Sequence, residues 1–171
     1  MLGERIQKAL NEQINAETYS SYLYLSMSTW FESNNLKGFA KWMRIQALEE
    51  SCHVLKIMDY IHEHGGRVLL TAVEAPDTEW DSPLAAFEAA YAHEQLVSGL
   101  IGKLMDIALE ERDHASTIML QWFVSEQVEE EATADEIVQQ LKLMADAPGG
   151  LFLLDREMSA RTFTAPEGTT I

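Results

Sequence analysis

The stretch QALEESCH, residues 46–53, decides the fold because it places a carboxylate and an imidazole one turn apart in a helical pattern. Glu50 and His53 differ by three positions, and such residues share one face of an α-helix. The stretch FVSEQVEE, residues 123–130, carries Gln127 and Glu130 with the same step. Each of these two residues lies 77 positions after its counterpart in the first stretch. The sequence therefore repeats a pair of polar side chains in two different helices.

Two further glutamates extend the repeat. Glu17 and Glu94 are also 77 positions apart, and each precedes its partner pair by 33 residues. Soluble proteins normally keep such residues in water, yet these lie on apolar helical stripes. The spacing predicts two helical hairpins that face each other across a metal site.

The composition favours one all-α domain. A chain of 171 residues can bury a substantial core as one domain. Apolar residues make up 47% of it, which is typical of a globular protein. Proline occurs only four times, and no alternating β-branched runs are present. Cys52 is the only cysteine, which excludes a disulfide framework and a CxxC metal site.

The net charge of −16 argues against a nucleic-acid partner, whose phosphates would be repelled. The charge fits cation attraction, high solubility or a salty habitat, and it does not choose among them. No segment has the apolar length of a membrane span, and the amphipathic N-terminus lacks a signal core. We therefore expect a cytoplasmic protein with no membrane partner.

Four long helices are expected from steps of three and four residues between buried-type positions. Ser33-Asn34-Asn35 is a turn signal, Gly65-Gly66 ends a helix, and Asp113 is a possible N-cap. The expected ranges are about 4–31, 36 or 37 to 64, 83–110 and 113–144.

The turn positions give the topology. The midpoint between Glu17 and Glu50 falls within the turn at residues 33–35, so an antiparallel hairpin sets the two carboxylates at one level. The midpoint between Glu94 and Gln127 falls at the second expected turn. The linker 65–82 reaches about 60 Å when extended, and a helix of this length measures about 40 Å. The linker can therefore place the third helix parallel to the second, as in a crossover four-helix bundle.

A short apolar segment follows the bundle. Pro148-Gly149-Gly150 breaks the chain before residues 151–158, which can form a strand or a short helix through about 161. The segment is too short to be stable alone, so it must dock on this subunit or on a neighbour. We expect one domain over residues 1–163, a fifth element at about 148–161, and a flexible tail at 164–171.

Four carboxylates at one level of an apolar interior cannot all stay ionised without cations. Two divalent iron ions would balance this charge and favour oxygen and imidazole ligands. The competing interpretation is a metal-free helical interaction protein with these side chains in solvent. The agreement of register, turn midpoint and apolar phase argues against it.

The sequence resembles the non-haem prokaryotic ferritins from residue 4 to about residue 163. The resemblance rests on NEQINAETYSSYLYLSMS (11–28), KGFAKWMRIQALEE (37–50) followed by His53, DSPLAAFEAAYAHE (81–94) and WFVSEQVEEEA (122–132). It implies a ferritin-like four-helix bundle with a long crossover between the second and third helices and a short fifth helix.

The resemblance also implies a ferroxidase centre with two irons. One iron would be bound by Glu17, Glu50 and His53. The second would be bound by Glu94 and Glu130, with Glu50 bridging the pair and Gln127 beside it as a ligand or hydrogen-bonding neighbour. A third, more exposed site would be formed by Glu49, Glu126, Glu129 and Glu130.

Two aromatic residues are candidates for a supporting role. Tyr24 matches a tyrosine near the family's iron pair, where it would donate an electron or a hydrogen bond; a packed core tyrosine is the alternative. Trp122 is a weaker candidate for electron transfer. Ser51 stands where bacterioferritins carry a haem-ligating Met, which argues against haem.

The implied function is iron storage with ferroxidase activity. Fe(II) would be oxidised by O2 or H2O2 and kept as a ferric oxyhydroxide mineral inside a homo-oligomeric shell of 24 subunits. The alternative is a non-storage di-iron oxidase or peroxidase of the rubrerythrin or oxygenase type. Such an enzyme would need a substrate pocket, a second imidazole or an electron-delivery module, and none is visible in the sequence.

Overall fold

The computed structural model describes residues 2–165, and within that range the chain forms five α-helices and no strand. The expected all-α class is therefore confirmed. None of the helices in the described range has both the length and the apolar composition needed to cross a membrane. The helices are α1 (Glu4–Ser33), α2 (Lys37–Glu63), α3 (Pro83–Glu110), α4 (His114–Met144) and α5 (Gly150–Met158).

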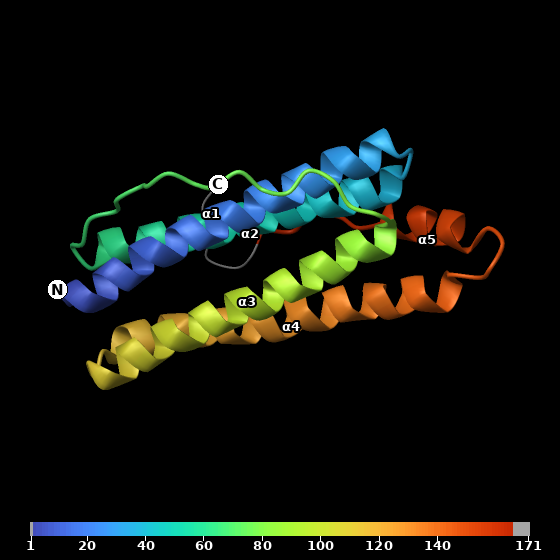
Figure 1. Ribbon diagram of the computed structural model, residues 1–171. Helices are drawn as coiled ribbons and strands as arrows, with labels where there is room; N and C mark the ends of the chain where they lie inside the picture. The colour runs from blue at the N-terminus through green and yellow to red at the C-terminus, as the bar shows by residue number, and fades with distance from the viewer. Residues whose placement is uncertain (1, 166–171) are drawn as a thin grey trace.

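The four long helices form two antiparallel hairpins, α1–α2 and α3–α4 (Figure 1). Asn35 closes the first turn with a φ of 59°, a left-handed conformation that asparagine tolerates better than most residues. Arg112 does the same in the second turn, with a φ of 55°. Asp113 then caps α4, since its Oδ1 accepts a hydrogen bond of 3.0 Å from the backbone N–H of Ser116. Both expected turns and the expected N-cap are present.

The linker between α2 and α3 runs along α1, as the expected crossover requires (Figure 1). Its backbone is tied to polar side chains on the outer face of that helix. Asn11 Oδ1 accepts from the N–H of Leu69 at 2.6 Å, and Ser26 Oγ donates to the carbonyl of Asp77 at 2.6 Å. The hydrogen bonds thus follow the linker along most of α1 and fix α3 parallel to α2.

Three expected boundaries differ from the structure. Helix α1 continues to Ser33, two residues beyond the expected end, and the Ser33 hydroxyl donates to the carbonyl of Thr29 at 2.9 Å. Helix α2 ends one residue early, at Glu63. The C-terminal segment is a helix, so the strand alternative was wrong, and this helix is shorter than the expected range 148–161. Of the tail expected at 164–171, residues 166–171 lie outside the described range.

The core consists of two apolar clusters on either side of a polar layer. One cluster lies near the α1–α2 turn and includes Phe31, Phe39 and Phe87. The other lies toward the opposite end and includes Ile57 and Phe123. The buried glutamates and His53 form the polar layer in the middle of the bundle, between the two clusters.

Helix α5 docks against the start of α2. The N-cap residue of α2 is Leu36, whose side chain makes no capping hydrogen bond. Instead Asp155 Oδ1, on α5, accepts from the backbone N–H groups of Gly38 at 2.8 Å and Phe39 at 3.1 Å. A carboxylate in this place satisfies free N–H groups and complements the positive end of the helix dipole. The close approach requires glycine, since a Cβ on Gly38 would lie 1.6 Å from the Asp155 carbonyl oxygen.

We predict that Gly38→Ala forces α5 away from α2 and destabilises the protein by about 1–3 kcal/mol, the usual cost of overpacking. Thermal unfolding measures the stability, and limited proteolysis at residues 145–150 reports on release of α5. The matched control is Gly99→Ala in α3, where a Cβ meets nothing within 4 Å. That variant gains up to about 1 kcal/mol of helix propensity. Equal stability of the two variants would contradict the docking described above.

Candidate metal centre

The polar layer buries the six side chains of the sequence repeat almost completely. These residues are between 1% and 8% exposed, although five are acids or a histidine. The helix phase predicted from the stripes is therefore correct at all six positions, which are Glu17, Glu50, His53, Glu94, Gln127 and Glu130.

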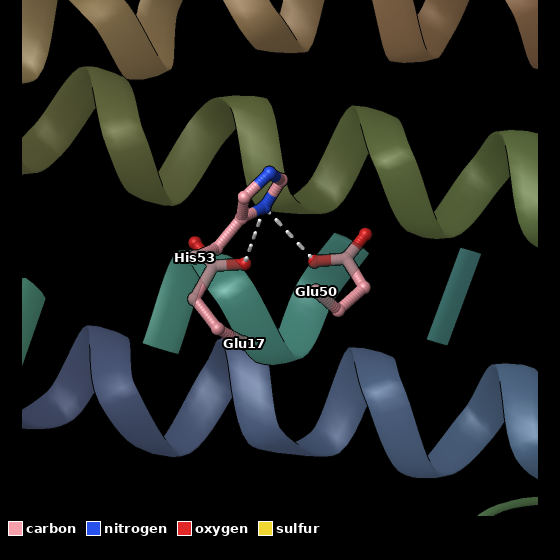
Figure 2. Close-up of side chains that lie close together, drawn as sticks. All are labelled: Glu17, Glu50 and His53. Atoms are coloured by element: carbon pink, nitrogen blue, oxygen red, sulfur yellow. Dashed lines mark ion pairs between the residues drawn. The ribbon is translucent and has the colours of Figure 1, made fainter. Parts of the chain in front are cut away.

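The first group of ligand atoms comes from α1 and α2. Figure 2 shows one nitrogen of the His53 ring facing the carboxylates of both Glu17 and Glu50. The Nδ1 atom lies 3.8 Å from Glu17 Oε2 and 3.2 Å from Glu50 Oε2. Among the described residues, neither ring nitrogen of His53 has a hydrogen-bond partner, and neither does Glu17 Oε2. Buried polar atoms without partners are rare, and one atom from each of the three residues falls within 4.8 Å of the others. The group can hold a metal ion.

A second group links α2 to α4. One ligand atom each from His53, Glu126 and Glu130 also lies within 4.8 Å of the others. His53 therefore stands between both groups, whereas the resemblance assigns it to the first iron only. Gln46 Nε2 donates to Glu130 Oε2 and orients that carboxylate.

Glu94 belongs to neither group of ligand atoms. The hydroxyl of Tyr24 donates to its Oε1, and Gln127 Nε2 donates to its Oε2 at 3.1 Å. Gln127 also reaches the Glu94 carbonyl at 3.3 Å. In this arrangement Gln127 is a hydrogen-bonding neighbour of Glu94 Oε2, and Tyr24 is a hydrogen-bonding neighbour of Glu94 Oε1. Both carboxylate oxygens of Glu94 are thus held by hydrogen bonds from within the bundle.

Burial and neighbouring charges shift the pKa values of the side chains in the layer. Burial, with the charges of Glu94 and Glu17, raises the pKa of Glu50 well above its ordinary value. Burial and the charge of Glu94 raise the pKa of Glu130 to about 8. Burial also pushes the pKa of Glu17 upward, but the nearby His53 and the hydrogen bond from Gln13 outweigh this effect and the pKa is lowered. Burial opposes the charged form of His53, yet the neighbouring carboxylates raise its pKa well above the ordinary value.

The remaining candidates lie at different distances from this layer. Glu49 is half-buried and its carboxylate is bonded to Arg161. Burial raises its pKa and Arg161 opposes the shift. Glu126 is half-buried, while Glu129 is exposed and belongs to neither group. The Trp122 ring lies edge-on to His53, with 5.4 Å between ring centroids.

Three side chains around the centre had no role assigned from the sequence. Gln13 Nε2 donates to Glu17 Oε1 at 2.8 Å, and Gln46 binds Glu130. Gln13 lies four residues before Glu17, and Gln46 lies four residues before Glu50. A search for amide side chains four residues before the acids of the repeat would have found both. Arg161 lies beyond the bundle, where no periodicity indicates its contact.

The chain matches the model of the ferritin-like domain over residues 7–144. It is 45% identical over 161 residues to the bacterial non-heme ferritin of Bacteroides fragilis, which covers 94% of this chain and 100% of that protein. An open-pore ferritin from the hyperthermophilic archaeon Archaeoglobus fulgidus superposes with a TM-score of 0.93 at 52% identity, covering 95% of this chain and 99% of that one. A closed form engineered from the same archaeal ferritin gives a TM-score of 0.94 at 52% identity and covers 96% and 100%. The chain belongs to the ferritin family.

We predict that divalent-cation binding at this centre releases protons at pH 7. Glu130, with a pKa of about 8, is mostly protonated there, and Glu50 and His53 have pKa values raised well above their ordinary ones. Because a ligand must lose its proton to bind, affinity falls as the pH falls. Titration calorimetry with Zn2+ in two buffers of different ionisation enthalpy counts the protons.

The variant Glu130→Gln should release about one proton fewer per saturated subunit than the wild type. Glu136→Gln, an exposed site on the same helix, is the control and should release as many as the wild type. An unchanged proton count in Glu130→Gln would mean that Glu130 is already ionised in the metal-free protein.

Proposed function

We propose that this protein is an iron-storage ferritin with ferroxidase activity. It oxidises Fe(II) at the polar layer and keeps the product as a ferric oxyhydroxide mineral inside a homo-oligomeric shell. The observation that carries the proposal is the buried cluster of Glu17, Glu50 and His53, in which one ligand atom of each residue lies within 4.8 Å of the others, while Glu17 Oε2 and both ring nitrogens of His53 have no hydrogen-bond partner in the described structure. Membership of the ferritin family supports the same function.

The residues of the layer divide the chemistry among them. Glu17, Glu50 and His53 bind one iron, Glu94 and Glu130 bind the second, and Glu50 bridges the two. Each Fe(II) loses one electron, so a pair supplies the two electrons that convert O2 and two protons to H2O2, or H2O2 and two protons to water. Carboxylate oxygens stabilise the ferric products more than the ferrous substrates because the charge on the iron is larger. Tyr24 and Gln127 orient Glu94 for this step.

The centre binds iron transiently and does not retain it as a permanent cofactor. Many di-iron bundles supply a second imidazole from the fourth helix, but this chain has Gln127-x-x-Glu130 at that place. The second iron therefore has fewer nitrogen ligands and binds more weakly. Glu49, Glu126 and Glu129, with Glu130, form the third site, which receives iron as it leaves the pair.

Storage requires an assembly, since one bundle encloses no mineral. We propose that residues 1–163 form the folding unit of a cytoplasmic shell of 24 copies. Three consecutive apolar side chains on α5 support contacts between copies: Leu151, Phe152 and Leu153 are 38%, 66% and 62% exposed. Apolar side chains gathered in this way favour burial against a neighbouring subunit.

Graded addition of Fe(II) to the metal-free protein in air tests the storage function. Oxidation is followed by absorbance, and the iron content and size of the product by elemental analysis and light scattering. Storage predicts many irons per subunit retained in one large particle. Retention of about two irons would instead indicate a non-storage di-iron enzyme, and the absence of saturable oxidation would remove the ferroxidase proposal altogether.

We predict that Glu50→Ala lowers the initial rate of Fe(II) oxidation tenfold or more while leaving a folded helical bundle. Even residues that only support metal ligands typically contribute 10–100-fold, and Glu50 is placed to bridge both ions. The fold survives because the substitution removes the cost of burying the Glu50 carboxyl group. Stopped-flow absorbance and circular dichroism measure the two effects. Glu63→Ala, exposed at the end of α2, is the control and keeps the wild-type rate.

A further inference from the structure

The chain that follows α5 runs along α2 toward the middle of the bundle. Asp155 contacts the first turn of α2 through the backbone of Gly38. Further along, Lys41 Nζ donates to the carbonyl of Ser159 at 2.7 Å. Arg161 then reaches Glu49, which lies next to Glu50 in sequence. The end of the described chain is thus brought to the edge of the candidate metal centre.

Arg161 is held in this place by three contacts. Its guanidinium binds the Glu49 carboxylate, lies 4.2 Å from the centroid of the Trp42 ring, and reaches the Trp42 carbonyl at 3.5 Å. The side chains of Arg161 and Glu49 are only 21% and 17% exposed. A partly shielded guanidinium–carboxylate bond is stronger than an ion pair in free solvent. Trp42 fixes the direction of the guanidinium through its ring face.

This ion pair lies on the segment of α2 that also carries Glu50 and His53. Glu49 lies four residues before His53 on α2, so the two side chains share one helix face. Burial and Arg161 have the largest effects on the pKa of Glu49, and the charges of His53 and Glu126 also act on it. The latter two, with Glu130, form the second group of ligand atoms, and His53 has no hydrogen-bond partner for either ring nitrogen in the described structure. A permanent positive charge of the protein therefore already binds one of the four carboxylates assigned to the third iron site.

We propose that Arg161 is an internal counter-cation that closes the third site by binding Glu49, so that iron must displace the guanidinium to use this carboxylate. The inference rests on the proposed function and deepens it. The competition lowers the affinity of the third site for iron. Iron that leaves the pair therefore does not stay bound there. Because α5 delivers Arg161, the position of α5 sets the strength of this competition.

A purely structural role for Arg161 is the alternative. In that case the ion pair only fastens the C-terminal segment to α2, and its removal would lower stability without changing metal binding. The two roles differ in whether the effect of Arg161 requires Glu49 as a metal ligand. A double-mutant cycle separates them.

The experiment measures Zn2+ binding to the assembled, metal-free protein by titration calorimetry. Zinc needs no oxidant, so the result does not depend on ferroxidase activity. We expect two zinc ions at the centre and a weaker third one. In Arg161→Ala and in Arg161→Gln, the third zinc should bind about fivefold or more tightly, within the usual range of coupling between linked sites. Circular dichroism and thermal unfolding show whether each variant keeps the fold.

Two comparisons make the result specific. Arg156→Ala removes an exposed arginine of α5 itself and should leave all zinc affinities unchanged. In a Glu49→Gln background, the substitution Arg161→Ala should have no effect on the third zinc. An unchanged or weakened third site in both Arg161 variants, with two zinc ions still bound, overturns this inference alone. Failure of the wild type to bind zinc at all overturns both the inference and the proposed function.

Discussion

The structure depends on one electrostatic constraint: four carboxylates share a buried layer between two apolar clusters. The turns of both hairpins set these residues at one level, and the helix phase turns all of them inward. Burial raises the pKa values of Glu50 and Glu130, and the neighbouring carboxylates raise that of His53, so these groups hold protons more readily than usual when no cation is bound. Divalent ions can replace these protons and supply the charge that the buried acids lack. The buried acids therefore allow the bundle to bind cations, but they make it less stable than an apolar layer would.

Most of this layer could be predicted from the sequence because helices convert spacing into geometry. Glu50 and His53 share a face through a three-residue step, and Glu17 faces Glu50 because their midpoint falls in a turn. The side-chain directions were less accessible. Glu94 turns toward Tyr24 and Gln127, and His53 stands between two groups of ligand atoms. Such choices depend on which partners lie across the interface, and helical periodicity does not encode them.

The structure of the C-terminal segment depends on contacts with distant residues. Residues 151–158 suit either a strand or a short helix, and the helix forms where Asp155 can cap α2 and Gly38 allows the approach. The contact of Arg161 with Glu49 joins residues 112 positions apart. It follows from the docking of α5, since no pattern in the segment itself points to it. One short helix thus connects the surface proposed for assembly with the edge of the metal centre.

Anomalous X-ray diffraction at the iron edge, on crystals soaked anaerobically with Fe(II), tests the central claim most directly. The account predicts two strong peaks in the polar layer, one among Glu17, Glu50 and His53 and one beside Glu130, with Glu94 rotated toward the second. An unoccupied layer, with the carboxylates of Glu17 and Glu50 turned outward to solvent, would contradict it.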